Sequence, residues 1–160
     1  MYPTQNDLPL QTRDAMVRLL NARLADTIDL ALQIKQAHWN VKGPNFIALH
    51  ELFDRFHTEV EAFYDDIAER ITALGGIAYG TVATVAEKST LPGYPTDIAD
   101  GQAHVKALAS AFAALAKSAR AAIETATGAG DADTADLFTG ISRGLDKSLW
   151  FLESHIQAAG

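Results

Sequence analysis

Four ionisable residues in the segment 45–75 have the types and the spacing of metal ligands. They are His50, Asp54, Asp65 and Glu69, separated by 4, 11 and 4 residues. At ~100° of rotation per residue in an α-helix, these spacings are close to whole turns, so the four side chains form one line. Imidazole and carboxylate groups together suit iron, zinc or manganese better than calcium. The pattern therefore predicts a divalent metal site.

The line of four borders an apolar stripe, where an unpaired charge is costly. Asp65 and Glu69 are also like charges one helical turn apart, which is mildly destabilising without a cation. A bound metal ion would remove both costs. Taken singly, each of these side chains would more often be structural or solvated, so only the combination favours ligands. The predicted stripe consists of Leu49, Phe53, Phe56, Val60, Phe63, Ile67, Ile71 and Leu74.

The spacing of the four residues has mirror symmetry. Positions 50 and 69 share a midpoint at 59.5, and so do positions 54 and 65. If two copies of this helix packed antiparallel about a two-fold axis, Asp54 would face the partner's Asp65, and His50 would face the partner's Glu69. A two-fold interface produces this reciprocity. The sequence thus predicts two identical metal sites between chains, which one chain cannot complete.

The alternatives to this site are weaker. A di-iron site inside one four-helix bundle needs Glu-x-x-His on two helices, and the nearest match here is Asp54-x-x-His57. We interpret His57 as a solvated group or one beside the ligands. His104 and His155 have no acid cluster around them. The chain has no cysteine, which excludes thiolate ligands and disulfides, and it contains no phosphate loop, HExxH motif or nucleophile elbow.

Composition favours one globular domain, 1–160. A chain of 160 residues with 48% hydrophobic content can bury a substantial core. A net charge of −7 and a pI of about 5.1 argue against a DNA-binding surface. No apolar run approaches the ~20 residues of a membrane span. Because the N-terminus also lacks a secretory pattern, we expect a cytoplasmic protein without membrane contact.

The first helix is expected to follow an extended arm, residues 1–10, which contains two prolines. Thr12 or Asp14 could cap it. Its apolar row ends at His38, just before Gly43 and Pro44 break the helix. The row consists of Met16, Leu20, Leu24, Thr27, Ala31, Ile34 and His38.

Four amphipathic segments without a convincing strand predict an all-α four-helix bundle. The connection 76–100 is long enough to cross from one end of the bundle to the other. Residues 81–88 could form a short helix within it. The remaining predicted helices are 45–75, capped by Asn45, then roughly 98–127, and then 133–157, capped near Asp131 or Asp133.

Four segments of the chain resemble the DNA-protection-during-starvation (Dps) family of mini-ferritins. They are HWNVKGPNFIALHELFD, DDIAER, LGGIAYGT with a downstream YP, and SRGLDKSLWFLES. The resemblance extends from about residue 10 to 157. It implies a ferritin-like four-helix subunit with a short helix in the long connection. It also implies that twelve subunits assemble into a hollow shell of tetrahedral symmetry.

The resemblance implies a ferroxidase centre at a two-fold interface. The matching ligands are His38, His50 and Asp54 from one subunit, with Asp65 and Glu69 from its neighbour, and Glu69 matches the bridging carboxylate. The implied reaction is oxidation of Fe(II) by hydrogen peroxide, followed by storage of ferric oxide. Zinc could occupy the same ligands. Trp39 matches a tryptophan beside the centre that intercepts stray oxidising equivalents.

Acidic residues elsewhere carry weaker predictions. Asp133 and Asp136 resemble the acidic lining of the family's three-fold pores, although helix capping and complementing the helix dipole would also explain acids there. Exposed acids could nucleate mineral inside the shell. The candidates for that role are Glu51, Glu59 and Glu61.

DNA binding is the competing function for this family. Members that bind DNA usually carry a basic tail, because neutralising phosphates dominates such affinity. Here the first 15 residues contain Arg13 as their only basic residue, beside Asp7 and Asp14. Twelve copies at −7 would sum to roughly −80, which repels DNA. We therefore expect weak DNA binding or none.

Overall fold

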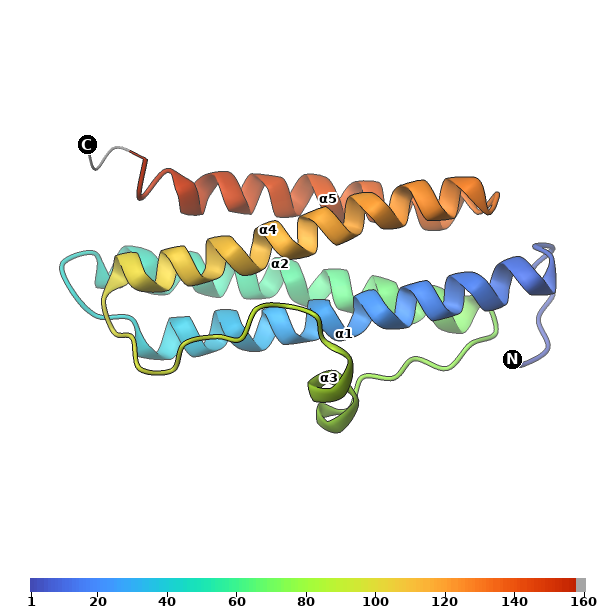
Figure 1. The fold of residues 1–160 in the computed structure, drawn as a ribbon, viewed down its shortest axis with the longest axis horizontal. Helices are drawn as coiled ribbons and strands as arrows, with labels where there is room; N and C mark the ends of the chain where they lie inside the picture. Colours follow the sequence, from blue (N-terminus) through green and yellow to red (C-terminus); the bar gives the residue numbers. More distant parts are fainter. Residues whose placement is uncertain (158–160) are drawn as a thin grey trace.

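The computed structural model describes residues 1–157, which form four long helices and one short one (Figure 1). Helices α1 and α2 pack side by side as one antiparallel pair, and α4 and α5 form the other. The connection through α3 runs along the outside of α1 to the start of α4. This arrangement confirms the predicted all-α bundle, its crossover and its short extra helix. The helices are α1 (Leu10–Asn40), α2 (Phe46–Ala73), α3 (Val82–Lys88), α4 (Gly101–Gly128) and α5 (Ala132–Glu153).

The predicted apolar stripes form the core between the two helix pairs. On α1 the row from Met16 to Ile34 is buried, and on α2 Phe63 is the only stripe member that keeps partial exposure. Phe56 of α2 packs on Phe112 of α4 with ring centroids 5.4 Å apart, which joins the two pairs. Burial of such side chains contributes roughly 1.5–3 kcal/mol each. Core packing is therefore what orients the polar edge of α2.

Several helix ends differ from the predictions. Helix α1 begins at Leu10 rather than after a side-chain cap at Thr12 or Asp14. Pro9 occupies the N-cap position with an extended ψ of 142°, and its carbonyl accepts the first helical hydrogen bond, from Arg13 N at 3.0 Å. Asn45 precedes α2, but its side chain makes no capping hydrogen bond.

The fourth long helix also stops earlier than predicted. Helix α5 ends at Glu153 because residues 154–157 form turns, with His155 N donating to Leu152 O at 3.1 Å. The predicted cap at Asp131 is confirmed, since its carboxylate accepts from Thr134 N. Residues 158–160 of the predicted domain lie outside the described residues.

The N-terminal arm lies against the end of α2. Tyr2 N donates to Gly75 O at 2.7 Å, and Arg13 donates from its guanidinium to the carbonyls of Leu8 and Leu74. Gly75 has a φ of +84°, and a Cβ there would lie 2.6 Å from the Tyr2 carbonyl oxygen. This close approach requires glycine. The single basic residue near the arm is thus engaged within the subunit.

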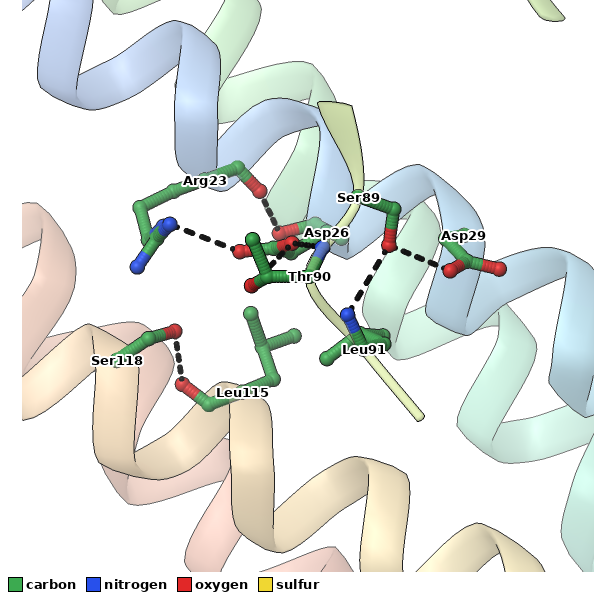
Figure 2. A network of polar contacts seen from close by, with 9 residues as sticks. Arg23, Asp26, Asp29, Ser89, Thr90, Leu91, Leu115 and Ser118 are labelled. Atoms are coloured by element: carbon green, nitrogen blue, oxygen red, sulfur yellow. Dashed lines mark hydrogen bonds and ion pairs between the residues drawn. The ribbon is translucent and has the colours of Figure 1, made fainter. Parts of the chain in front are cut away.

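A polar network fastens the crossover connection to α1 (Figure 2). Asp26 is fully buried, 3.0 Å from the Arg23 guanidinium, and accepts from Thr90 N at 2.7 Å. Asp29 accepts from the Ser89 hydroxyl at 2.5 Å. Buried charges persist only when they are paired in this way. The network fixes the path of the connection toward α4.

None of the helices within residues 1–157 is long and apolar enough to cross a membrane.

Candidate metal centre

His38 and His50 face each other where α1 ends and α2 begins. Their rings stack with centroids 3.7 Å apart and planes inclined by 21°. Nδ1 of His38 lies 2.8 Å from the carbonyl oxygen of His50, and Nδ1 of His50 lies 2.9 Å from the carbonyl oxygen of His38. Because a carbonyl only accepts, both Nδ1 atoms carry the proton, which leaves each Nε2 lone pair available to a metal. The donor set fits a bound metal ion.

The tight turn between α1 and α2 makes this reciprocal contact possible. Gly43 adopts a φ of +108°, a conformation that favours glycine. Lys42 N donates to Ala99 O at 2.9 Å, which ties the turn to the residues that precede α4. Phe46 covers one side of His50 at a centroid distance of 5.2 Å. The two histidine rings are therefore held in place by their hydrogen bonds to backbone carbonyls and by the turn that joins their helices.

Asp54 lies one turn beyond His50 and is exposed. Its Oδ1 accepts a hydrogen bond from Lys35 Nζ of α1 at 2.6 Å, and this contact lowers the pKa of Asp54 below the ordinary aspartate value. Asp54 is therefore ionised at neutral pH, with an ammonium beside it. The sequence analysis did not identify Lys35 as a residue near the candidate ligands. It lies almost one turn before His38 on the same helix, and this spacing could have indicated that it shares an edge with His38.

Asp65 and Glu69 are exposed on the distant half of α2. Asp54 and Asp65 are 11 positions apart, which corresponds to roughly 16 Å along the helix axis, so one ion cannot bind both in one chain. Within residues 1–157, no group of three or more histidines and acids is close enough to hold a metal. One chain thus brings His38 and His50 into contact, with Asp54 one helical turn further along α2, and leaves Asp65 and Glu69 apart. Completion of the site by a second chain stays a prediction.

Large apolar side chains surround the histidine end of the hairpin. Trp39 is 67% exposed, Ile47 60% and Phe46 44%. Isolated exposed apolar residues are ordinary, but a group of them beside polar groups is typical of a surface that another chain covers. Trp39 follows His38 directly in the sequence.

The other histidines lie outside this group. His104 is buried in α4, with its Nδ1 2.5 Å from the Tyr94 hydroxyl, and burial lowers its pKa. His155 is exposed and donates from Nδ1 to Phe151 O. His57 is half-buried on α2, one turn beyond Asp54.

The acids that the sequence analysis singled out for capping, a pore or mineral differ in burial and contacts. Asp131 is buried and paired with Arg70 at 2.7 Å, so it is structural. Glu59 is partly buried and accepts from the Ser148 hydroxyl at 2.7 Å. The other four, Glu51, Glu61, Asp133 and Asp136, are exposed, although Glu61 accepts from the Tyr64 hydroxyl at 3.2 Å and Asp133 lies 3.7 Å from the Arg70 guanidinium.

A four-helix bundle with one long crossover connection between its two helix pairs is the architecture of ferritin-like proteins. The ferritin-like domain model matches residues 17–159. The DNA protection during starvation protein of Agrobacterium fabrum (strain C58) is 49% identical over 156 residues, which cover 98% of this chain and 96% of that relative. The chain belongs to the Dps family of ferritin-like proteins.

Solved structures agree with this assignment. Mycobacterium smegmatis Dps superposes with a TM-score of 0.94 at 32% identity, covering 100% of this chain and 96% of that one. A Dps protein from Vibrio cholerae O1, described as a member of a broad superfamily of ferritin-like diiron-carboxylate proteins, superposes with a TM-score of 0.91 at 25% identity and covers 98% of each chain.

Proposed function

We propose that this protein oxidises Fe(II) at sites between two-fold related subunits and stores the ferric product inside a dodecameric shell in the cytoplasm. The observation that carries the proposal is the His38–His50 pair, in which both Nε2 atoms are available beside the ionised Asp54. The complementary acids, Asp65 and Glu69, lie on the same helix but too far away to join them in one chain.

Antiparallel pairing of α2 with its copy would unite the two halves. Asp54 would then lie near the partner's Asp65, and His50 near the partner's Glu69. The partner's Glu69 would bridge two iron positions, one held by His38 and the partner's Asp65, the other by His50 and Asp54. Membership in a family with ferritin-like diiron-carboxylate relatives supports iron as the substrate.

Two adjacent ferrous ions suit hydrogen peroxide as the oxidant. Peroxide accepts one electron from each ion and, with two protons, gives two water molecules and two ferric ions. This route avoids a one-electron reduction, which would release hydroxyl radical. The imidazoles of His38 and His50 would bind iron through Nε2, because each Nδ1 keeps its proton and donates it in a hydrogen bond to a backbone carbonyl. Trp39, next to His38, would donate electrons to any oxidant that escapes.

Storage requires iron entry and a mineral surface. Asp133 and Asp136 are exposed at the start of α5 and would attract cations if three subunits meet there. Glu51 and Glu61 are exposed and are candidates for nucleating mineral. Glu59 is a weaker candidate because it is partly buried and one of its oxygens accepts from Ser148.

Two other functions are possible for the same shell. Relatives are named for DNA protection, but the guanidinium of Arg13 is engaged by backbone carbonyls and the chain is acidic. We therefore propose that protection does not require tight DNA binding. A zinc-binding shell would use the same ligands, and iron turnover separates the two.

The decisive experiment compares Fe(II) oxidation by stoichiometric hydrogen peroxide and by dioxygen in the wild type and in Asp65→Ala/Glu69→Ala. We expect the double variant to lose most of the peroxide-driven rate. The control is Asp66→Ala, which removes an exposed acid next to the ligand line. A wild-type rate in the double variant would show that the site assignment is wrong. A stable monomer in solution would exclude a site between subunits.

A further inference from the structure

A tyrosine and a histidine form a hydrogen-bonded pair where the crossover connection meets α4. The Tyr94 hydroxyl lies 2.5 Å from Nδ1 of His104, and the two rings are inclined by only 22°. His104 is 1% exposed, and its Nε2 has no hydrogen-bond partner among residues 1–157. Neither side chain belongs to the candidate metal centre.

The phenol is the donor in this contact. Burial raises the pKa of Tyr94, so the phenol keeps its proton at neutral pH. Burial lowers the pKa of His104, so its imidazole is neutral there and has one nitrogen that accepts. Among the described residues, Nδ1 of His104 is the acceptor that the Tyr94 hydroxyl meets. The pair therefore holds a phenol proton beside a base.

The pair lies near the end of α1 that carries Trp39. The backbone of Asn40, which directly follows Trp39, is close enough to His104 to offset part of the effect of burial on its pKa. Lys42 N donates to Ala99 O at 2.9 Å, which fixes this end of α1 to the segment before α4. The structure thus connects the pair with the segment that contains Trp39.

The other tyrosines lack such a partner. Tyr2 and Tyr79 are exposed, and the hydroxyl of Tyr64 donates to the exposed carboxylate of Glu61 at 3.2 Å. A phenol loses an electron more readily when its proton moves to a base in the same step, because a phenol cation is then avoided. The contact with a buried imidazole makes Tyr94 the tyrosine suited to one-electron oxidation.

We propose that Tyr94 and His104 form a proton-coupled electron donor that restores Trp39 after a hydroxyl radical has taken an electron from it and become hydroxide. Tyr94 gives one electron to the Trp39 radical cation and its hydroxyl proton to Nδ1 of His104. The products are neutral tryptophan, a tyrosyl radical and an imidazolium.

Reduction by Fe(II) completes the sequence. One electron from Fe(II) and the proton from His104 restore the Tyr94 phenol, and Fe(III) is released. Tyr94 is half-buried and lines a surface groove of about 390 Å³, so a small reductant can reach it. The source of the oxidant rests on the proposed function, whereas the transfer from Tyr94 to Trp39 does not.

A hydrogen bond that only joins the connection to α4 is the alternative explanation. In that case, removal of the Tyr94 hydroxyl would alter stability without changing the decay of a tryptophan radical. Radical kinetics in the assembled protein separates the two explanations.

The test is pulse radiolysis of the assembled, metal-free shell, with azide radical as the oxidant of the exposed tryptophans. In the wild type, the absorption of the tryptophan radical should decay as that of a tyrosyl radical grows. Tyr94→Phe should lose most of this growth, while its control, Tyr79→Phe, should keep it. Trp39→Phe should lose it as well, while Trp150→Phe, at another exposed position, should keep it.

His104→Gln tests the proton acceptor. It should slow the transfer by roughly 100-fold, the lower end of what a positioned proton acceptor contributes, while His155→Gln at an exposed position should not. If His104→Gln fails to assemble, the wild type in D₂O replaces it. The transfer should be slower in D₂O than in water, because a proton moves with the electron, and equal rates would overturn the inference.

Tyrosyl growth at the wild-type rate in Tyr94→Phe, in Trp39→Phe or in His104→Gln would also overturn it. Because the shell is free of metal and the oxidant is supplied from outside, these outcomes do not depend on iron chemistry. If the radical transfer occurs as expected but the wild type does not oxidise Fe(II), the proposed function fails instead.

Discussion

A site shared between subunits can be rebuilt from two defective variants. His50→Ala/Asp54→Ala removes ligands from one half of each site, and Asp65→Ala/Glu69→Ala removes the other half. A shell of either variant alone has no complete site. In a two-fold pair with one subunit of each variant, however, one site combines His50 and Asp54 of one subunit with Asp65 and Glu69 of the other, so it has all four of these ligands. The second site of the pair has none of the four.

The expected recovery follows from this geometry. If the two variants combine at random in equal amounts, half of the pairs are mixed and each has one complete site of two, so about a quarter of all sites are intact. Co-assembled shells should therefore recover about a quarter of the wild-type rate of peroxide-driven Fe(II) oxidation. The same fraction should appear in the number of tightly bound ions.

The assay uses the two variants with different affinity tags, co-expressed and purified through both tags, and measures the initial oxidation rate. Shells assembled separately and then mixed are the control, and they should stay inactive as long as subunits do not exchange. If co-assembly restores no activity while mass spectrometry confirms mixed shells, the site does not lie between these two halves, and the mirror spacing of α2 has another cause.

Four other predictions concern stability and partners. Asp26→Asn should lower the free energy of unfolding by about 2–3 kcal/mol, because it leaves the guanidinium of Arg23 without its counter-ion, and should lower Tm by roughly 5–10 °C at fixed subunit concentration; an unchanged melting curve would contradict this. Gly75→Ala should cost about 1–3 kcal/mol and release the arm, which limited proteolysis would detect as earlier cleavage near the N-terminus. Burial lowers the pKa of His104, so below the ordinary histidine pKa of about 6.5 the unfolded chain binds a proton more readily and stability falls with falling pH. His104→Gln should reduce this slope in denaturant titrations at several pH values, whereas His155→Gln, at an exposed position, should leave it unchanged. The wild-type shell should give no gel shift with nanomolar protein at physiological salt, under conditions in which a basic-tailed DNA-binding protein does.

Periodicity predicted the helices well because burial determines it. The stripe from Leu49 to Leu74 lies in the core as expected, since a helix with one apolar face has one favourable way to pack. Helix ends were harder to predict. Asp131 caps α5 as predicted because its carboxylate reaches the next turn, but Pro9 starts α1 through backbone conformation alone, which side-chain patterns do not reveal.

The contacts within the candidate centre depend on how α1 lies against α2. The sequence identified His50 and Asp54 by their spacing, and a family resemblance added His38. Neither indicated that each histidine donates to the carbonyl of the other, or that Lys35 pairs with Asp54. Both features follow from the register of two helices, which is determined by side-chain packing across the whole hairpin. A pattern read along one helix does not contain that register.

The two ends of α2 differ in how their charges are balanced. Asp54 is paired with Lys35, while Asp65 and Glu69 have no ion-pair partner among the described residues. Two like charges one turn apart are mildly destabilising, and burying them in an interface without a cation would cost more. Under the proposed function, the histidine end would supply imidazole ligands but too few carboxylates for two iron ions. An antiparallel second copy of α2 would bring the acidic end of one chain to the histidine end of the other, which is what the proposal requires.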